Sequence, residues 1–212
     1  MKTESPRVAV DLDNFFTRED RRIRSELDEF LRIPSVSARS EHNGDMVRCA
    51  DWLAARLRDI GMQATIHQTP GHPIVLGEWR KAEPDAPTVL VYGHYDVQPV
   101  EPLDLWTSPP FEPTVREGKL FARGSVDDKG QLYIHVKAAE AILRQRGSLP
   151  VNLIFLAEGE EEVGSEHLAE FIEKNAKLLA ADSVVISDSA MFAPGQPSIL
   201  SSLRGLSYFQ ID

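Results

Sequence analysis

Residues 88–98 read TVLVYGHYDVQ, an apolar β-branched run followed at once by a histidine and an acid. The run predicts a buried strand, so His94 stands at its C-terminal end. Side chains two positions apart in an extended segment share a face, and Asp96 can therefore accept a hydrogen bond from one ring nitrogen of His94. Such a bond fixes the tautomer of the imidazole and raises its basicity toward a metal. The stretch predicts a strand that ends in a metal ligand with its orienting carboxylate.

Acidic clusters recur downstream of this strand. GSVDDKG occupies residues 124–130, EGEEEVGS at 158–165 directly follows the apolar run 151–157, and the run 184–186 leads into Ser187 and Asp188. In open α/β sheets, ligands bind beyond the C-terminal ends of the strands. Carboxylates gathered there repel one another unless a cation neutralises them. A run such as 160–162, taken alone, could equally be a solvated face; the combination predicts a divalent-metal site.

Composition narrows the class of protein. The chain has 212 residues, 42% hydrophobic and 26% charged, which is ordinary for a globular protein. Its net charge of -10, from 33 acids and 23 bases, disfavours nucleic acid or an anionic membrane as a partner. The single cysteine, Cys49, excludes an internal disulfide and predicts a small buried side chain. The opening MKTESP lacks the apolar core of a signal peptide and no run reaches membrane length, so we expect a cytoplasmic protein.

Periodicity predicts alternating elements. Helices are expected at 13–32, 44–60, 127–146 and 165–181, and strands at 62–67, 74–79, 88–92, 151–157, 183–187 and 199–203. The proline-rich segment 99–113 is expected to be a long ordered loop. This alternation predicts a three-layer α/β domain with a mixed, mostly parallel central sheet. Residues 206–212 read as a strand without a cap, so we expect an incomplete domain.

Four ordered motifs point to one family: HYDVQP at 94–99, WTSPPF at 106–111, GSVDDKG at 124–130 and EGEEEVGS at 158–165. Together they resemble the M20 metallopeptidases, and among these the carnosine-dipeptidase-like branch. The resemblance covers essentially the whole chain and implies the zinc-exopeptidase fold. It also implies hydrolysis of dipeptides or short peptides by a two-metal centre, usually with two Zn²⁺ ions bridged by a carboxylate and a water. Mn²⁺ or Co²⁺ would also suit such ligands.

The resemblance assigns the ligands position by position. Asp127 matches the bridging carboxylate, His94 and Asp188 match the other ligands of one metal, and Glu162 matches a ligand of the second. It further implies a cis peptide bond between Asp127 and Asp128.

The same resemblance assigns the proton-transfer residues. Glu161 matches the catalytic general base, and Asp96 matches the partner that orients His94. Glu160 stands where many relatives carry an apolar residue, so we expect it outside the ligand set. No role in the site is expected for His42, His67 and His72, or for His135 and His167, which fall in helical patterns without acidic partners at ligand spacing.

The resemblance also implies further parts of the enzyme. We expect residues 1–205 to be the N-terminal part of the catalytic domain and 206–212 to begin a lid domain that forms a homodimer and is followed by a further histidine ligand. On that expectation, these 212 residues alone bind at most about one metal tightly and are inactive.

Two alternatives to peptide hydrolysis stay open. Deacylation of N-acyl amino acids would use the same site, and a non-catalytic interaction protein could be built on a hydrolase scaffold. Loss of Glu161 or Asp127 would have favoured the second alternative, and both are present.

Overall fold

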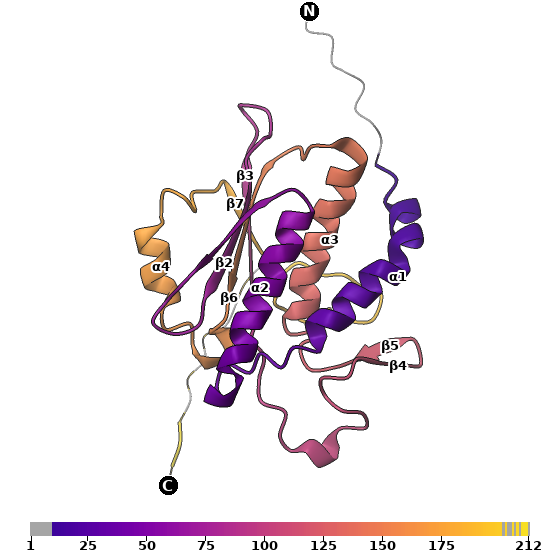
Figure 1. Cartoon of the computed structure of the whole chain (residues 1–212), viewed down its shortest axis with the longest axis vertical. Helices are drawn as coiled ribbons and strands as arrows, with labels where there is room; N and C mark the ends of the chain where they lie inside the picture. Colours follow the sequence, from indigo (N-terminus) through magenta and orange to yellow (C-terminus); the bar gives the residue numbers. More distant parts are fainter. Residues whose placement is uncertain (1–9, 201, 203–204, 206, 208, 212) are drawn as a thin grey trace, which may run out of the picture.

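A five-stranded mixed sheet forms the centre of the part of the chain described in the computed structural model, residues 10–200, 202, 205, 207 and 209–211 (Figure 1). The sheet order is β1-β2-β6-β3-β7. Its strands are β1 (Gln63–His67), β2 (Ile74–Trp79), β3 (Thr88–His94), β6 (Asn152–Glu158) and β7 (Ser183–Ile186). β6, β3 and β7 run parallel, whereas β1 pairs with β2 and β2 pairs with β6 in antiparallel fashion.

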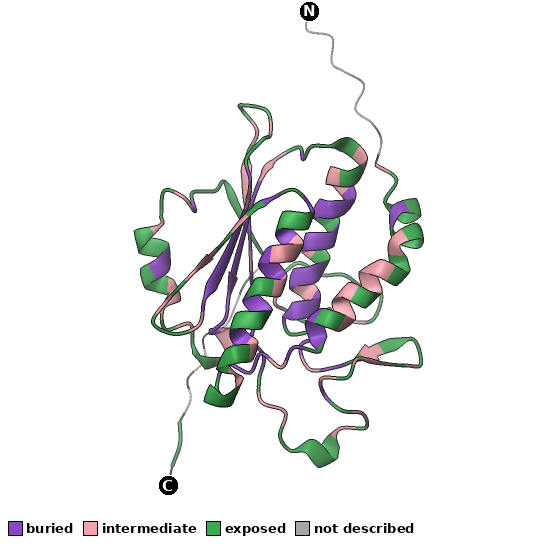
Figure 2. Ribbon diagram, viewed as in Figure 1, coloured by how far each residue is buried: buried purple, intermediate pink, exposed green. Residues whose placement is uncertain are grey.

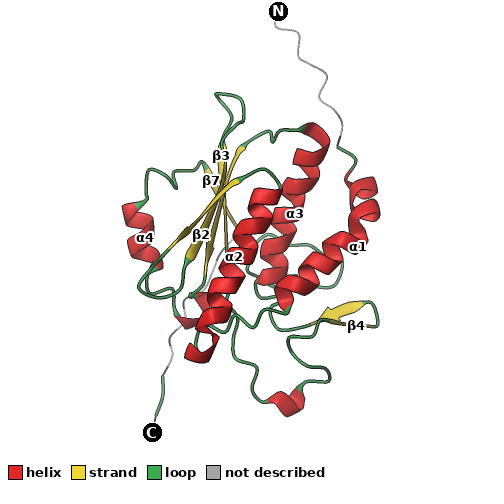
Figure 3. Cartoon of the chain, viewed as in Figure 1, coloured by secondary structure: helices red, strands yellow, loops and turns green. Residues whose placement is uncertain are grey.

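Helices cover both faces of this sheet (Figure 3). α2 and α3 lie on one face with α1 packed outside α3, and α4 lies on the opposite face. Their bounds are α1 (Leu12–Leu31), α2 (Asn43–Asp59), α3 (Lys129–Arg146) and α4 (Leu168–Lys174); the 3-10 helices are η1 (Ser40–His42), η2 (Leu103–Leu105) and η3 (Glu161–Val163). The three layers and the mixed sheet confirm the predicted α/β class. Two of its four strand pairings are parallel and two are antiparallel.

Side chains that alternate along the strands divide the core between the two faces of the sheet. The central strands are buried over most of their length (Figure 2). Val75 and Phe155 pack against the helices of the α2 and α3 side, and their neighbours Leu76 and Ile154 pack with Phe171 of α4. All five side chains are buried. A strand buried on both faces shows a continuous apolar run rather than alternating polarity, which is why residues 151–157 are apolar almost throughout.

Two elements differ from the sequence prediction. The helix expected at 165–181 is only α4, because Gly164 and Ser165 adopt left-handed conformations before it and the Asn175 side chain binds the Phe171 carbonyl at its end. A hairpin, β4 (Thr114–Arg116) with β5 (Lys119–Phe121), was not predicted.

Some predictions concern the ends of the chain. Ile199 and Leu200 are not in a strand, and residues 201 and 203 of that predicted strand lie outside the described residues. Of the predicted lid start, 206, 208 and 212 lie outside them, as does the N-terminal segment 1–9. Within the described ranges, no helix is both long enough and apolar enough to cross a membrane.

A network of buried and partly buried charges joins α1 to α3. Lys137 of α3 pairs with Glu26 of α1 and, at 2.6 Å, with Glu140. Arg22 of α1 reaches both acids, at 2.7 Å for Glu26 and 2.9 Å for Glu140. Burial opposes the charge of Glu26, but hydrogen bonds from Lys137, Arg22 and Tyr133 outweigh it and lower the pKa of this carboxyl to about 2.

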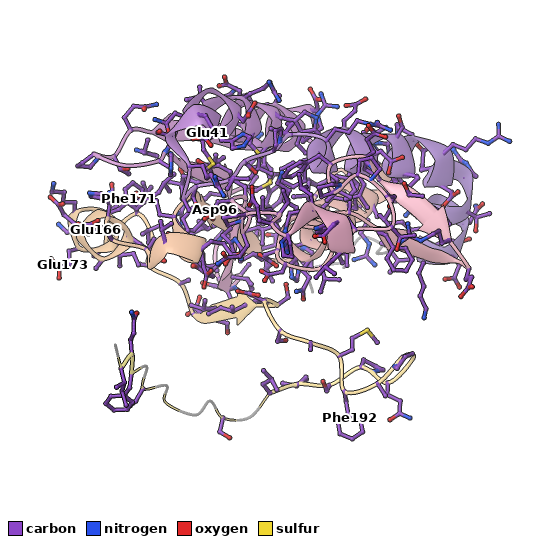
Figure 4. The ribbon with its side chains drawn as sticks, turned by 90° about the horizontal axis from the view of Figure 1, so that it is seen from below. Glu41, Asp96, Glu166, Phe171, Glu173 and Phe192 are labelled. Atoms are coloured by element: carbon purple, nitrogen blue, oxygen red, sulfur yellow. The ribbon has the colours of Figure 1, made fainter. Side chains whose placement is uncertain are left out.

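We expect Glu26 to make the fold sensitive to acid. Its pKa is about 2 in the folded chain and near its ordinary 4.5 when unfolded, so its contribution to stability is complete above 4.5 and is lost as the pH falls toward 2. Urea unfolding at pH 6, 4 and 3 should therefore show the stability gap between wild type and Glu26→Gln narrowing with acid. Glu173→Gln, a change at an exposed residue at the periphery of Figure 4, should leave a gap near zero throughout. A Glu26→Gln gap that stays constant with pH would contradict this account.

Candidate metal centre

Three parallel strands end at one edge of the sheet and bring the predicted site residues together. His94 closes β3 and pairs in register with Glu158, the last residue of β6. On the other side of β3, Tyr92 pairs with Ile186 at the end of β7, two residues before Asp188. The C-terminal ends of neighbouring parallel strands necessarily meet at one edge, so side chains far apart in the sequence converge there.

His94 is the centre of this convergence. Its side chain is fully buried, and Nδ1 lies 3.2 Å from Asp96 Oδ1 and 3.1 Å from the Asp96 carbonyl oxygen. Nε2 faces the opposite way and lies 3.1 Å from Asp127 Oδ1, 3.7 Å from Asp188 Oδ2 and 4.0 Å from Glu161 Oε2. One ring nitrogen is therefore engaged by a buried carboxylate, while the other points into a group of acids.

The segment directly before α3 supplies Asp127. The peptide bond between Asp127 and Asp128 is cis, which confirms the prediction from the resemblance. Asp128 is buried, and its Oδ2 accepts a hydrogen bond at 3.1 Å from the backbone N–H of His94. Gly93 permits this approach, because a Cβ at that position would lie 2.6 Å from the Asp128 carboxylate. Asp128 thus ties the end of β3 to the beginning of α3.

A closed turn after β6 carries the two predicted glutamates. Glu158 accepts hydrogen bonds from the Tyr92 hydroxyl at 2.5 Å and from the Ser165 hydroxyl at 2.8 Å. The bond from Ser165 joins the two ends of the turn that contains η3, and with it Glu161 and Glu162, and the bond from Tyr92 ties the turn to β3. Sequence reasoning assigned no role to Glu158, Tyr92 or Ser165, although Glu158 and Ser165 bound the motif EGEEEVGS.

Gln98 is a further residue that the sequence analysis left without a role. Its side-chain amide donates a hydrogen bond of 2.7 Å to Glu162 Oε2. The only signal in the sequence is its place in the motif HYDVQP.

The ionisation of the cluster reflects burial and mutual repulsion. Burial and neighbouring acids raise the pKa of Glu161, Glu162 and Asp188 above their ordinary values. Burial disfavours the charged ring of His94, but the hydrogen bond to Asp96 and the surrounding acids raise the pKa of His94 to about 10. Partly buried carboxylates that repel one another favour the binding of a cation, because the cation neutralises their charge.

The donor set fits divalent metals. Ligand atoms of His94, Asp127 and Asp188 lie within 4.8 Å of one another, and those of His94, Glu161 and Glu162 form a second such group. Imidazole with carboxylates is a ligand set that suits Zn²⁺, and oxygen-rich sets also suit Mn²⁺.

Glu160 points away from this cluster. It lies against His167, with 2.9 Å between Glu160 Oε2 and His167 Nδ1. His167, for which no role in the site was expected, pairs with Glu160 because the turn at 164–165 brings these positions, seven residues apart, together. His135 contacts Ser187 beside the site, at 2.8 Å from the hydroxyl.

The mixed sheet, with an imidazole facing several carboxylates at the C-terminal ends of its parallel strands, is typical of α/β proteins with a divalent-metal centre. Residues 90–200 match the profile of peptidase family M20/M25/M40. The chain belongs to this family, as the four motifs predicted.

Individual relatives support this membership. A Cys-Gly metallodipeptidase of Schizosaccharomyces pombe is 37% identical, over 94% of this chain and 43% of that protein. A succinyl-diaminopimelate desuccinylase of Thiobacillus denitrificans is 34% identical, over 76% of this chain and 41% of that protein. The crystal structure of human carnosine dipeptidase 1 matches with a TM-score of 0.77 at 30% identity, over 83% of this chain and 40% of that one. The chain thus spans about two fifths of the length of these relatives.

Proposed function

We propose that the protein is a metal-dependent hydrolase that cleaves the peptide bond of dipeptides or short peptides. The observation that carries the proposal is the position of His94 Nε2, which faces Asp127, Asp188 and Glu161 while Asp96 engages Nδ1. Dipeptidases among the relatives support the choice of substrate.

We assign the residues as follows. His94, Asp127 and Asp188 would hold one metal, and Asp127 and Glu162 would hold a second; Zn²⁺ is the proposed metal. Bound metal would polarise the scissile carbonyl and acidify the attacking water. Asp96 orients the His94 ring through Nδ1 and fixes its tautomer.

Glu161 is the proposed general base. Its carboxylate accepts the proton of the water as the oxygen attacks the carbonyl carbon, and delivers a proton to the leaving amine as the C–N bond breaks. The raised pKa of Glu161, caused by burial and by the nearby acids Glu162 and Asp188, moves this group toward the pH at which it operates.

A second candidate activity is deacylation of N-acyl amino acids. The desuccinylase among the relatives favours it, and the same ligands and base would serve.

We also propose that the whole protein is a homodimer and that it is cytoplasmic. The expected boundary between the catalytic domain and a lid at residue 205 stays a prediction.

An activity panel tests the proposal. The full-length protein, stripped of metal and reloaded with Zn²⁺, Mn²⁺ or Co²⁺, should hydrolyse Cys-Gly or β-Ala-His and should lose this activity in chelator. Turnover of N-succinyl or N-acetyl amino acids in place of dipeptides would transfer the assignment to the second candidate. Absence of metal-dependent turnover on both panels would overturn the assignment as a hydrolase.

A further inference from the structure

The Asp96 carboxylate lies at the junction of three segments of the chain. The side chain is fully buried and lies in the interior in Figure 4, unlike Phe192, which lies on an outlying loop. Oδ1 lies 3.2 Å from His94 Nδ1 and accepts the backbone N–H of Glu161 at 3.3 Å. Oδ2 accepts the backbone N–H of Glu162 at 3.1 Å. One carboxylate therefore contacts both the predicted imidazole ligand and the turn that carries the two glutamates.

Ser37 completes this arrangement from a distant part of the sequence. Its hydroxyl donates to Asp96 Oδ2 at 2.6 Å, the shortest of the four contacts. Hydrogen bonds from a hydroxyl to a carboxylate at this distance are charge-assisted and about twice as strong as neutral ones. Among the described residues, Ser37 and His94 are the side chains that form a hydrogen bond or an ion pair with this carboxylate.

The segment that carries Ser37 is itself fixed. Val36 forms a parallel β-bridge with Val97, and the Val97 N–H donates to the Ser35 carbonyl at 2.9 Å. His72 Nε2 lies 3.1 Å from the Ser37 carbonyl oxygen. The hydroxyl is therefore presented from a rigid support, and Ser37 itself is buried.

We propose that Ser37 is a positioning residue of the metal centre, which acts through Asp96. The χ2 torsion of an aspartate has a broad distribution without sharp rotamer minima. The orientation of the carboxylate plane is therefore set by its hydrogen-bond partners. The Ser37 hydroxyl holds Oδ2, which leaves Oδ1 directed at His94 and keeps both backbone N–H groups of the glutamate turn in place. This inference rests on the proposed function and extends it to a residue outside every motif that the sequence analysis quoted.

Zinc affinity of the full-length protein tests the inference without relying on peptide hydrolysis. Loss of an outer partner of a metal ligand typically costs 10–100-fold in affinity or activity. In competition with a chromophoric chelator, Ser37→Ala should bind Zn²⁺ about 10–100-fold more weakly, and kcat should fall by a similar factor. Ser37→Thr, which keeps the hydroxyl, should restore both to within about threefold of wild type.

Ser35→Ala is the matched control. Ser35 is buried in the same segment, but its hydroxyl donates to the Tyr95 carbonyl at 2.7 Å and not to Asp96. This variant should lower the unfolding temperature at least as much as Ser37→Ala while leaving zinc affinity unchanged.

The decisive measurement is a double-mutant cycle. If Ser37 acts through Asp96, Ser37→Ala should have no further effect on zinc affinity once Asp96→Ala is present. Full additivity of the two changes would overturn the inference, as would weakened binding in Ser37→Thr or normal binding in Ser37→Ala. A protein that binds zinc with this pattern but hydrolyses no substrate would contradict the proposed function alone.

Discussion

Replacement of Glu161 by glutamine should lower kcat/KM for dipeptides by roughly 10²–10⁴-fold, the usual contribution of a general base. This loss corresponds to about 3–5 kcal/mol of transition-state stabilisation. The amide keeps the shape of the side chain but cannot accept the proton of the attacking water. Steady-state kinetics with saturating Zn²⁺ measure the effect, and metal analysis should show normal metal content because Glu161 is not among the proposed ligands.

Glu160→Gln is the matched control for this change. The two residues are adjacent, but Glu160 faces His167, so its replacement should leave kcat within about threefold of wild type, an effect well below that of losing a base. Equal losses in the two variants would argue against a distinct role for Glu161. Loss of metal from Glu161→Gln would instead indicate that Glu161 belongs to the ligand group with His94 and Glu162.

The edge of the sheet could be predicted because it follows from local patterns. Apolar runs that end in a histidine or an acid locate the ends of β3, β6 and β7, and parallel pairing then brings His94, the glutamate turn and Asp188 together. The contact between the Asp96 carboxylate and the His94 ring could be predicted from the two-residue period of an extended segment.

The Ser37–Asp96 contact and the β4–β5 hairpin could not be predicted from local sequence patterns. Nothing local in the sequence marks Ser37, which meets Asp96 across 59 positions through a bridge between Val36 and Val97. The β4–β5 hairpin turns at Glu117 and Gly118, both with positive φ, whereas the common hairpin signals are Asn-Gly and Asp-Gly.

Replacement of Lys137 by methionine should destabilise the fold by about 3 kcal/mol, at the lower end of the 3–5 kcal/mol typical of breaking a buried ion pair. Methionine fills similar volume, but it leaves Glu26 and Glu140 without the ammonium between them. The loss is moderated because Glu140 keeps Arg22 at 2.9 Å and Arg144 at 2.7 Å. Urea unfolding at pH 7 measures the change.

Lys174→Met provides the comparison on a solvent-exposed helix. Lys174 pairs with Glu170 one turn away on α4, and both side chains are more than half exposed, so the change should cost far less than Lys137→Met. Adding Glu26→Gln to Lys137→Met should recover part of the lost stability, because it removes one of the two carboxylates that lost the Lys137 ammonium. If Lys137→Met cost no more than Lys174→Met, the charge network would not be what holds α1 against α3, and the apolar contacts of α1 would have to account for its position.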